Sequence, residues 1–119
     1  MIKTIYWHGG RPGIRRGGVL LPPSITKVPS LSEYGAAGVH RRDRVYVTIR
    51  REVALMYAAG VRNGVLYQCV PIGDIDPDPD CLDPGLSWQC SMARVLRVIK
   101  PREAEIELVR EALLSTWIG

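Results

Sequence analysis

Hydrophobic and polar residues alternate, or β-branched and aromatic residues cluster, in several short segments that predict strands. The predicted strands are residues 2–7, 44–49, 64–70 and 93–99, with a further short one at Val19-Leu20-Leu21. Residues 51–59 combine strong helix formers with Gly60 as a stop signal, and residues 103–116 space apolar side chains three and four positions apart. The pattern predicts a compact α+β domain of two small packed sheets with short helices.

Glycine and proline interrupt this pattern at three places. His8-Gly9-Gly10 follows the first predicted strand and is interpreted as a flexible turn. The stretch from Arg11 to about Gly38 is dense in Gly, Pro and Ser, so we expect it to be mostly loop. Residues 74–80 alternate aspartate with other residues and include two prolines, which remove backbone donors. We expect this aspartate segment to be a stiff surface loop rather than a central strand.

The size and composition of the chain indicate one globular domain, residues 1–119. Apolar residues make up 46% and charged residues 24%, which excludes a disordered protein. No apolar run reaches the roughly 18 residues that span a bilayer, and the N-terminal residues lack the apolar stretch of a signal peptide. We therefore expect a cytoplasmic protein without a membrane partner. Three cysteines without a C-x-x-C pair predict reduced thiols and no zinc site.

Charge is distributed unevenly along the chain. The formal net charge is +4, although five of the twelve acidic side chains fall in the single segment 74–83. The rest of the chain is therefore strongly basic. A basic body favours anionic partners, such as nucleic acid, the pyrophosphate of a dinucleotide or an acidic protein, without choosing among them.

Three sets of residues could carry chemistry. His8 could hydrogen-bond a ribose hydroxyl while Gly9 admits a planar ligand group, although a histidine in a turn is often bonded only to its neighbours. Tyr46 on a strand and Tyr57 on the following helix could hold a flat cationic ring between them, or could simply pack in the core. Asp78, in the aspartate segment, could face a bound sugar.

A calcium loop and a solvated turn are the alternatives for the aspartate segment. Asp74, Asp76, Asp78 and Asp80 supply oxygens at every second position. The EF-hand loop requires Gly at its sixth position and Glu at its twelfth. With Asp74 first, those positions hold Pro79 and Gly85. The EF-hand motif fails, and we predict no metal site.

The order of these residues resembles the His-Tyr-carboxylate class of ADP-ribosyltransferases, and most closely the rifampin ADP-ribosyltransferase family. The matching stretches are Tyr6-Trp7-His8-Gly9-Gly10, residues 15–23, Arg44-Val45-Tyr46-Val47-Thr48 and Asp76-Pro77-Asp78-Pro79-Asp80. The sequence departs from the family pattern where Gly10 replaces a threonine, Pro23 a glycine and Pro77 the first of two paired aspartates. The Ser-Asn-aromatic element of the family is also missing, which puts a rifamycin acceptor in doubt.

The resemblance implies an NAD-dependent mono-ADP-ribosyltransferase with a split β-sheet core. Tyr46 and Tyr57 would hold the nicotinamide of NAD between them, with its amide on Gly9. His8 would bind the adenosine ribose. The carboxylate of Asp78 would stabilise the positive charge that develops on the other ribose when nicotinamide leaves.

The remaining ligand contacts and the acceptor stay open. Arg15, Arg16 or the pair Arg41-Arg42 could contact the pyrophosphate of NAD. The acceptor could be a small molecule such as a rifamycin, a protein or a nucleic acid. Two alternative functions are an enzyme similar to RNA 2′-phosphotransferases, which would use the basic run 40–44, and a small basic module that binds nucleic acid or phosphate without catalysis.

Overall fold

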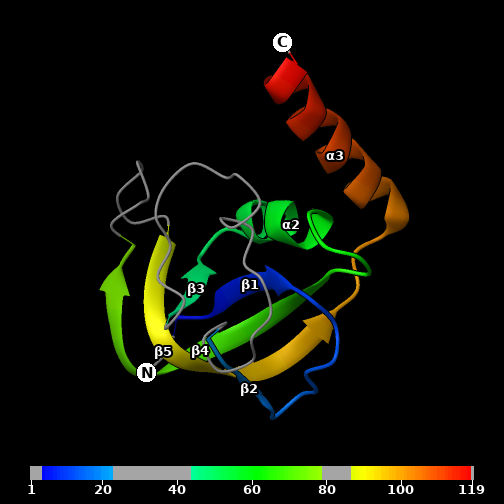
Figure 1. Cartoon of the computed structure of the whole chain (residues 1–119). Coiled ribbons are helices and arrows are strands. Elements are labelled where there is room, and N and C mark those ends of the chain that lie inside the picture. Colours follow the sequence, from blue (N-terminus) through cyan, green and yellow to red (C-terminus); the bar gives the residue numbers. More distant parts are fainter. Residues whose placement is uncertain (1–3, 23–43, 79–86, 119) are drawn as a thin grey trace.

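The computed structural model describes residues 4–22, 44–78 and 87–118, with side chains up to residue 115 (Figure 1). Five strands and two helices lie in this part of the chain. They are β1 (Tyr6–Gly10), β2 (Val19–Leu20), β3 (Val45–Thr48), α2 (Arg51–Ala59), β4 (Val65–Pro77), β5 (Ser87–Ile99) and α3 (Glu103–Ile118). The predicted α+β class is confirmed, and both predicted helices and the short strand β2 are present.

All strands belong to one antiparallel sheet, in the order β2-β5-β3-β1-β4. Strand β4 also pairs with β5, so β1, β3, β5 and β4 form a closed ring. Closure depends on β4 and β5, which are 13 residues long each and shift register twice along their pairing. Such irregularities bend a strand and increase its twist. The prediction of two separate packed sheets was therefore wrong.

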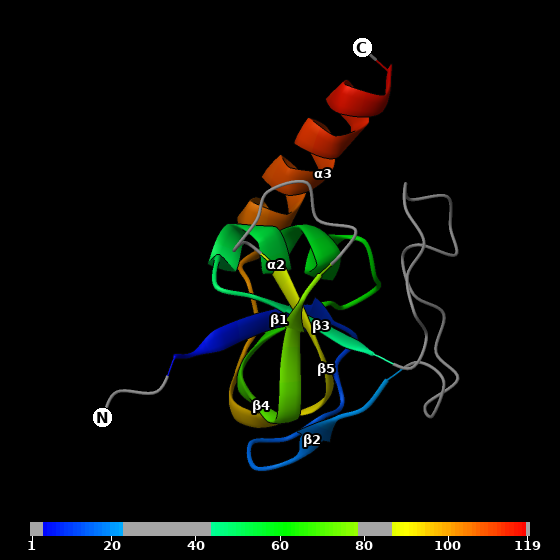
Figure 2. The same cartoon turned by 90° about the vertical axis from the view of Figure 1, so that its left-hand side faces the viewer.

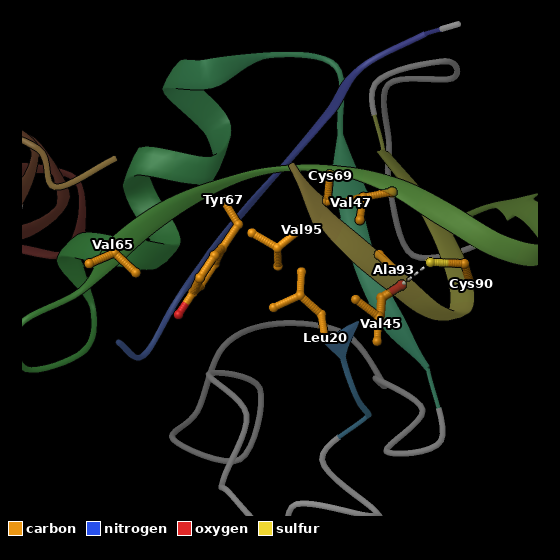
Figure 3. Packing of buried hydrophobic residues seen from close by; sticks show 9 residues of the cluster. All are labelled: Leu20, Val45, Val47, Val65, Tyr67, Cys69, Cys90, Ala93 and Val95. Atoms are coloured by element: carbon orange, nitrogen blue, oxygen red, sulfur yellow. Dashed lines mark hydrogen bonds between the residues drawn. The ribbon is translucent and has the colours of Figure 1, made fainter. Parts of the chain in front are cut away.

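The inside of the ring is filled by the main hydrophobic cluster (Figure 3). Its buried members are Leu20, Val45, Val47, Val65, Tyr67, Cys69, Cys90, Ala93 and Val95. Burial raises the pKa of Cys69 to about 12 and that of Cys90 to about 11. Both thiols therefore stay protonated at neutral pH and act as small apolar side chains, as expected for reduced cysteines.

A second cluster lies outside the ring, where the helices cover the sheet. Ala54, Leu55 and Ala58 of α2 pack with Leu66 of β4, and Trp7 of β1 borders the cluster. The first turns of α3 add partly buried apolar side chains to it. Figures 1 and 2 both show α2 lying across β1 while the C-terminal part of α3 projects away from the sheet. Neither described helix is long and apolar enough to cross a bilayer.

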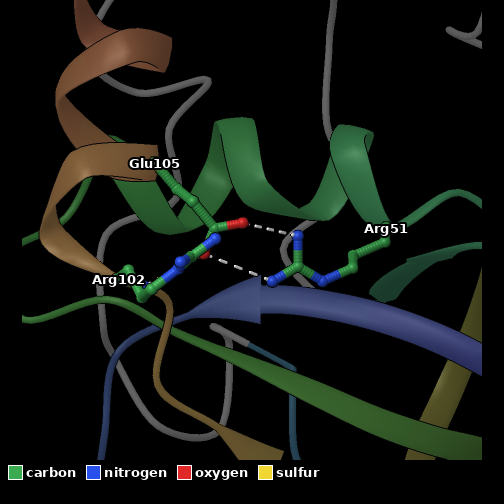
Figure 4. Close-up of polar contacts among 3 residues, drawn as sticks. All are labelled: Arg51, Arg102 and Glu105. Carbon is green, nitrogen blue, oxygen red and sulfur yellow. Dashed lines mark hydrogen bonds and ion pairs between the residues drawn. The ribbon is translucent and has the colours of Figure 1, made fainter.

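The two helices are joined by a charged contact at the start of each (Figure 4). Arg51 Nη1 donates to Glu105 Oε1 at 3.0 Å, and the backbone N–H of Arg102 donates to Glu105 Oε2 at 3.0 Å. The Arg51 guanidinium also lies 6.0 Å from the centroid of the Trp7 ring. The hydrogen bond from Arg51 is the main cause that lowers the pKa of Glu105. These contacts fix the start of α3 against α2 and β1.

The strands differ most from the sequence prediction around the aspartate segment. Residues 74–80 were expected to be a loop, yet residues 74–77 belong to β4, which extends seven residues beyond the predicted strand end at 70. In this extension β4 pairs only with β5 and is an edge strand, where a missing proline N–H is tolerated. Strand β5 correspondingly begins at Ser87 instead of 93. The expected turn at His8-Gly9-Gly10 is also wrong, because β1 continues through Gly10.

Candidate functional site

His8 lies in β1 with its imidazole on the interior side of the sheet, beside Tyr67 of β4. Its Nδ1 donates a hydrogen bond of 2.8 Å to the backbone oxygen of Tyr46 on β3. In the neutral ring this leaves Nε2 as an acceptor, and Nε2 has no partner among the described residues. Burial lowers the pKa of His8, and the hydrogen bond to Tyr46 opposes this shift. His8 is thus neutral, and its Nε2 can accept a hydrogen bond.

Gly9 has a structural reason to be glycine. A Cβ atom here would lie 1.8 Å from the backbone oxygen of Ala54 and 2.9 Å from the backbone nitrogen of Ala58, both in α2. The helix therefore occupies the space above Gly9 on the outer side of the sheet. A ligand amide could reach Gly9 only from its backbone edge, on the side of β3.

Strands β1 and β3 touch at one end only. Their register contains the single pair Trp7 and Thr48, whereas the following residues, 8–10, pair in register with β4 alone. The imidazole of His8 reaches across this divergence to the backbone of Tyr46. The polar edge of β1 next to β3 is therefore the place where the sheet opens.

Tyr46 points to the outside of the ring. Its neighbours Val45 and Val47 are both in the interior cluster, and successive side chains of a strand alternate between faces. Tyr57 lies on α2, which covers the same outer side, and it is 40% exposed. Tyr46 and Tyr57 therefore share the outer side of the sheet, whereas the ring of His8 lies on the interior side. Their proposed sandwich around nicotinamide stays a prediction.

Polar side chains form two parallel rows across β3, β5 and β4 on this outer side. Tyr46 is opposite Gln89, and Gln89 is opposite Asp76. Thr48 is likewise opposite Ser87. Because residues directly opposite each other project to the same face, each row forms one strip. We call these strips, with Arg44 beside them, the outer polar face.

Asp78 extends the second row. It comes directly after β4, and its backbone N–H donates to the carbonyl oxygen of Ser87 at 3.0 Å. Continuing the pairing of Pro77 with Trp88 places Asp78 opposite Ser87, on the same face as Tyr46. The side chain is partly buried. Of the predicted site residues, Tyr46 and Asp78 are thus brought onto one face.

Gln89 and Ser87 were missed by sequence reasoning. The stretch Ser87-Trp88-Gln89-Cys90 does alternate, with Trp88 and Cys90 facing the interior cluster. Its polar positions have small or neutral side chains, which carry no motif. Only the strand register places Gln89 beside Tyr46 and Asp76, and Ser87 beside Thr48.

A basic hollow lies at the other end of the ring. Arg15, Arg16 and Arg97 line it together with Gly13, Ile14 and Val98, and its volume is about 640 Å³. None of the described residues that line it is acidic. The loop that carries it is held by Tyr67, whose hydroxyl donates to the Arg11 carbonyl and accepts from the N–H of Ile14. The other arginine candidates, Arg41 and Arg42, lie outside the described residues.

No protein-family model matches this chain, and no curated protein matches it significantly. Within residues 4–22, 44–78 and 87–118 no group of three or more His, Cys, Asp or Glu side chains could hold a metal ion, and Asp80 lies outside the described residues.

The lowered pKa of His8 predicts a pH dependence of stability. The unfolded chain takes up the proton first, near the ordinary histidine pKa of about 6.5. The contribution of neutral His8 is complete above that pH, and the free energy of unfolding decreases as the pH falls below it. Urea denaturation between about pH 7 and pH 5 should show a smaller slope for His8→Gln than for the wild type. Equal slopes would mean that folding does not shift His8.

Proposed function

We propose that this protein is a mono-ADP-ribosyltransferase that cleaves NAD between nicotinamide and ribose and transfers ADP-ribose to an acceptor. The observation that carries the proposal is the shared face of Tyr46 and Asp78. They project from β3 and from the end of β4, with β5 between them. Two strand spacings across the sheet, combined with an offset of two residues along it, amount to about 12 Å. This separation leaves room for a sugar between an aromatic ring and a carboxylate.

The chemistry requires these two groups on opposite sides of the reacting carbon. The bond from ribose C1′ to the nicotinamide nitrogen breaks, and the electron pair leaves with nicotinamide, which becomes neutral. The ribose carbon gains positive charge, and the Asp78 carboxylate stabilises that charge. The acceptor nucleophile then bonds to C1′ and loses its proton. The ring of Tyr46, with Tyr57, would orient the leaving nicotinamide.

His8 and the basic hollow fit the other half of NAD. The Nε2 of neutral His8 can accept a hydrogen bond from a ribose hydroxyl. Arg15 and Arg16 supply positive charge for the pyrophosphate, and none of the described residues lining the hollow is acidic. β1 and β3 share only the register pair Trp7 and Thr48, so the proposal requires NAD to reach both sides of the sheet where the two strands diverge.

A direct test measures nicotinamide released from NAD by the purified chain, followed by labelled NAD with fractions of a cell lysate. Release of nicotinamide and label on one fraction would support the proposal and identify the acceptor class. A chain that neither binds nor cleaves NAD would refute it.

Tyr46→Ala should weaken NAD binding because it removes one stacking face from the cationic nicotinamide. The expected loss is about 1–2 kcal/mol, roughly a 5- to 30-fold higher Kd, measured by calorimetry. Tyr46→Phe keeps the ring and is the control, expected to bind close to the wild type. Unchanged affinity in Tyr46→Ala would exclude the stacking role.

The basic hollow also favours a second candidate, a phosphate- or nucleic-acid-binding module without catalysis. Arg15, Arg16 and Arg97 are exposed around the hollow, as in surfaces that contact phosphate backbones. Binding of nucleic acid with a steep salt dependence and without any effect of NAD would favour this function over the transferase.

A further inference from the structure

Two buried side-chain atoms in the described part of the chain have no hydrogen-bond partner, Gln89 Oε1 and Arg44 Nε. Gln89 is only 7% exposed. Buried polar atoms are nearly always paired in folded proteins, so an unpaired one requires an explanation. Both atoms belong to the outer polar face, which makes a shared explanation natural.

The two side chains come from adjacent strands. Gln89 lies between Tyr46 and Asp76 in its row. Arg44 precedes the paired residue Val45 and donates from Nη1 to Ser91 Oγ at 3.3 Å. Gln89 and Arg44 are therefore diagonal neighbours across β5 and β3, a spacing of about 7–8 Å that long side chains can bridge. One presents an unpaired acceptor and the other an unpaired donor.

The surrounding charges limit what can bind between them. Asp76 is opposite Gln89, and Asp78 follows in the next row. These carboxylates disfavour a phosphate at this place. A neutral group that both donates and accepts hydrogen bonds suits the pair Gln89 and Arg44, and a sugar diol has this chemistry.

We propose that Gln89, assisted by Arg44, binds the hydroxyl groups of the nicotinamide-side ribose of NAD. This inference rests on the proposed transferase function and deepens it. The ribose would then lie above β5, between the aromatic ring of Tyr46 and the carboxylate of Asp78. Gln89 Oε1 accepts from one hydroxyl, and Arg44 Nε donates to the other. The sugar is thus oriented by side chains on β5 and β3, between Tyr46 and Asp78.

The test compares Gln89→Met, which keeps the side-chain length and removes the amide, with Gln68→Met. Gln68 undergoes the same change on β4, opposite Trp7, outside the outer polar face. Calorimetry measures the binding of NAD and of two analogues that lack the 2′- or the 3′-hydroxyl of the nicotinamide-side ribose. Gln89→Met should bind NAD about 10-fold more weakly, and Gln68→Met should bind like the wild type.

The analogues show whether the lost contact is to the ribose. The wild type should bind at least one analogue about 10-fold more weakly than NAD. Gln89→Met should bind that analogue and NAD with Kd values within about twofold of each other. Unchanged NAD affinity in Gln89→Met, or an undiminished preference for NAD over both analogues, would overturn the inference while leaving the transferase function standing. A wild type that does not bind NAD would refute the transferase function itself.

Thermal unfolding without ligand separates binding from a structural role. Because Gln89 Oε1 is unpaired in the folded chain, Gln89→Met should melt at the same temperature as the wild type or higher. A melting temperature lowered by several degrees would show that Gln89 serves the fold, and it would overturn the inference.

Discussion

Replacing Asp78 by alanine is expected to slow nicotinamide release by about 100-fold or more, the usual effect of losing one preorganised electrostatic group. The carboxylate stabilises charge that develops only as the bond breaks, so turnover should fall far more than NAD affinity. Steady-state release of nicotinamide, with NAD binding by calorimetry and the melting temperature measured alongside, separates these effects.

Asp74→Ala is the matched control. It removes the same charge four residues earlier, within β4, but Asp74 is exposed where β4 and β5 shift register, beside Gly73 with its positive φ of 81°. We expect it to keep wild-type activity. Full activity in Asp78→Ala would remove this residue from the mechanism, and a selective loss in Asp76→Ala would move the role by two residues.

Gly9→Ala is expected to destabilise the fold strongly, by about 3 kcal/mol or more. The added Cβ would fall 1.8 Å from the backbone oxygen of Ala54, and a backbone atom in a helix cannot turn aside as a side chain can. Helix α2 would have to move away from β1. Urea denaturation followed by circular dichroism gives the change in the free energy of unfolding.

Gly10→Ala is the control for this substitution. Its Cβ would meet only the His8 imidazole, at 3.1 Å from Nε2, so a much smaller loss is expected. Equal stability of Gly9→Ala and the wild type would contradict the close contact between β1 and α2.

The helices and the centres of the strands could be predicted from the sequence because their signals are local. The interval 51–59 has helix formers followed by Gly60, and the structure places α2 at those residues. The closed sheet could not be predicted, since it depends on β4 and β5 pairing beyond their apolar centres. The prolines of segment 74–80 indicated a loop, but Pro77 lies in β4 at a sheet edge, where a strand tolerates a proline.

In the candidate site, too, residues with a local sequence signal could be predicted, and residues placed by strand pairing could not. The order of His8, Tyr46 and Asp78 could be noticed in the sequence because each stands in a short motif. Gln89 has no motif, and its position between Tyr46 and Asp76 follows only from the register of three strands. The sequence also did not indicate on which face of the sheet His8 lies, because residues 8–10 were expected to form a turn and instead belong to β1.

The position of β1 has a consequence for how the chain folds. This N-terminal strand lies between β3 and β4, which come at least 35 residues later in the sequence. Strands β4 and β5 can pair early because they are neighbours along the chain, whereas β1 requires the closure of long loops before its contacts form. Insertion of β1 closes the ring and brings His8 to Tyr46 in the same step. Chains in which β1 has not yet paired therefore lack the hydrogen bond between His8 and Tyr46.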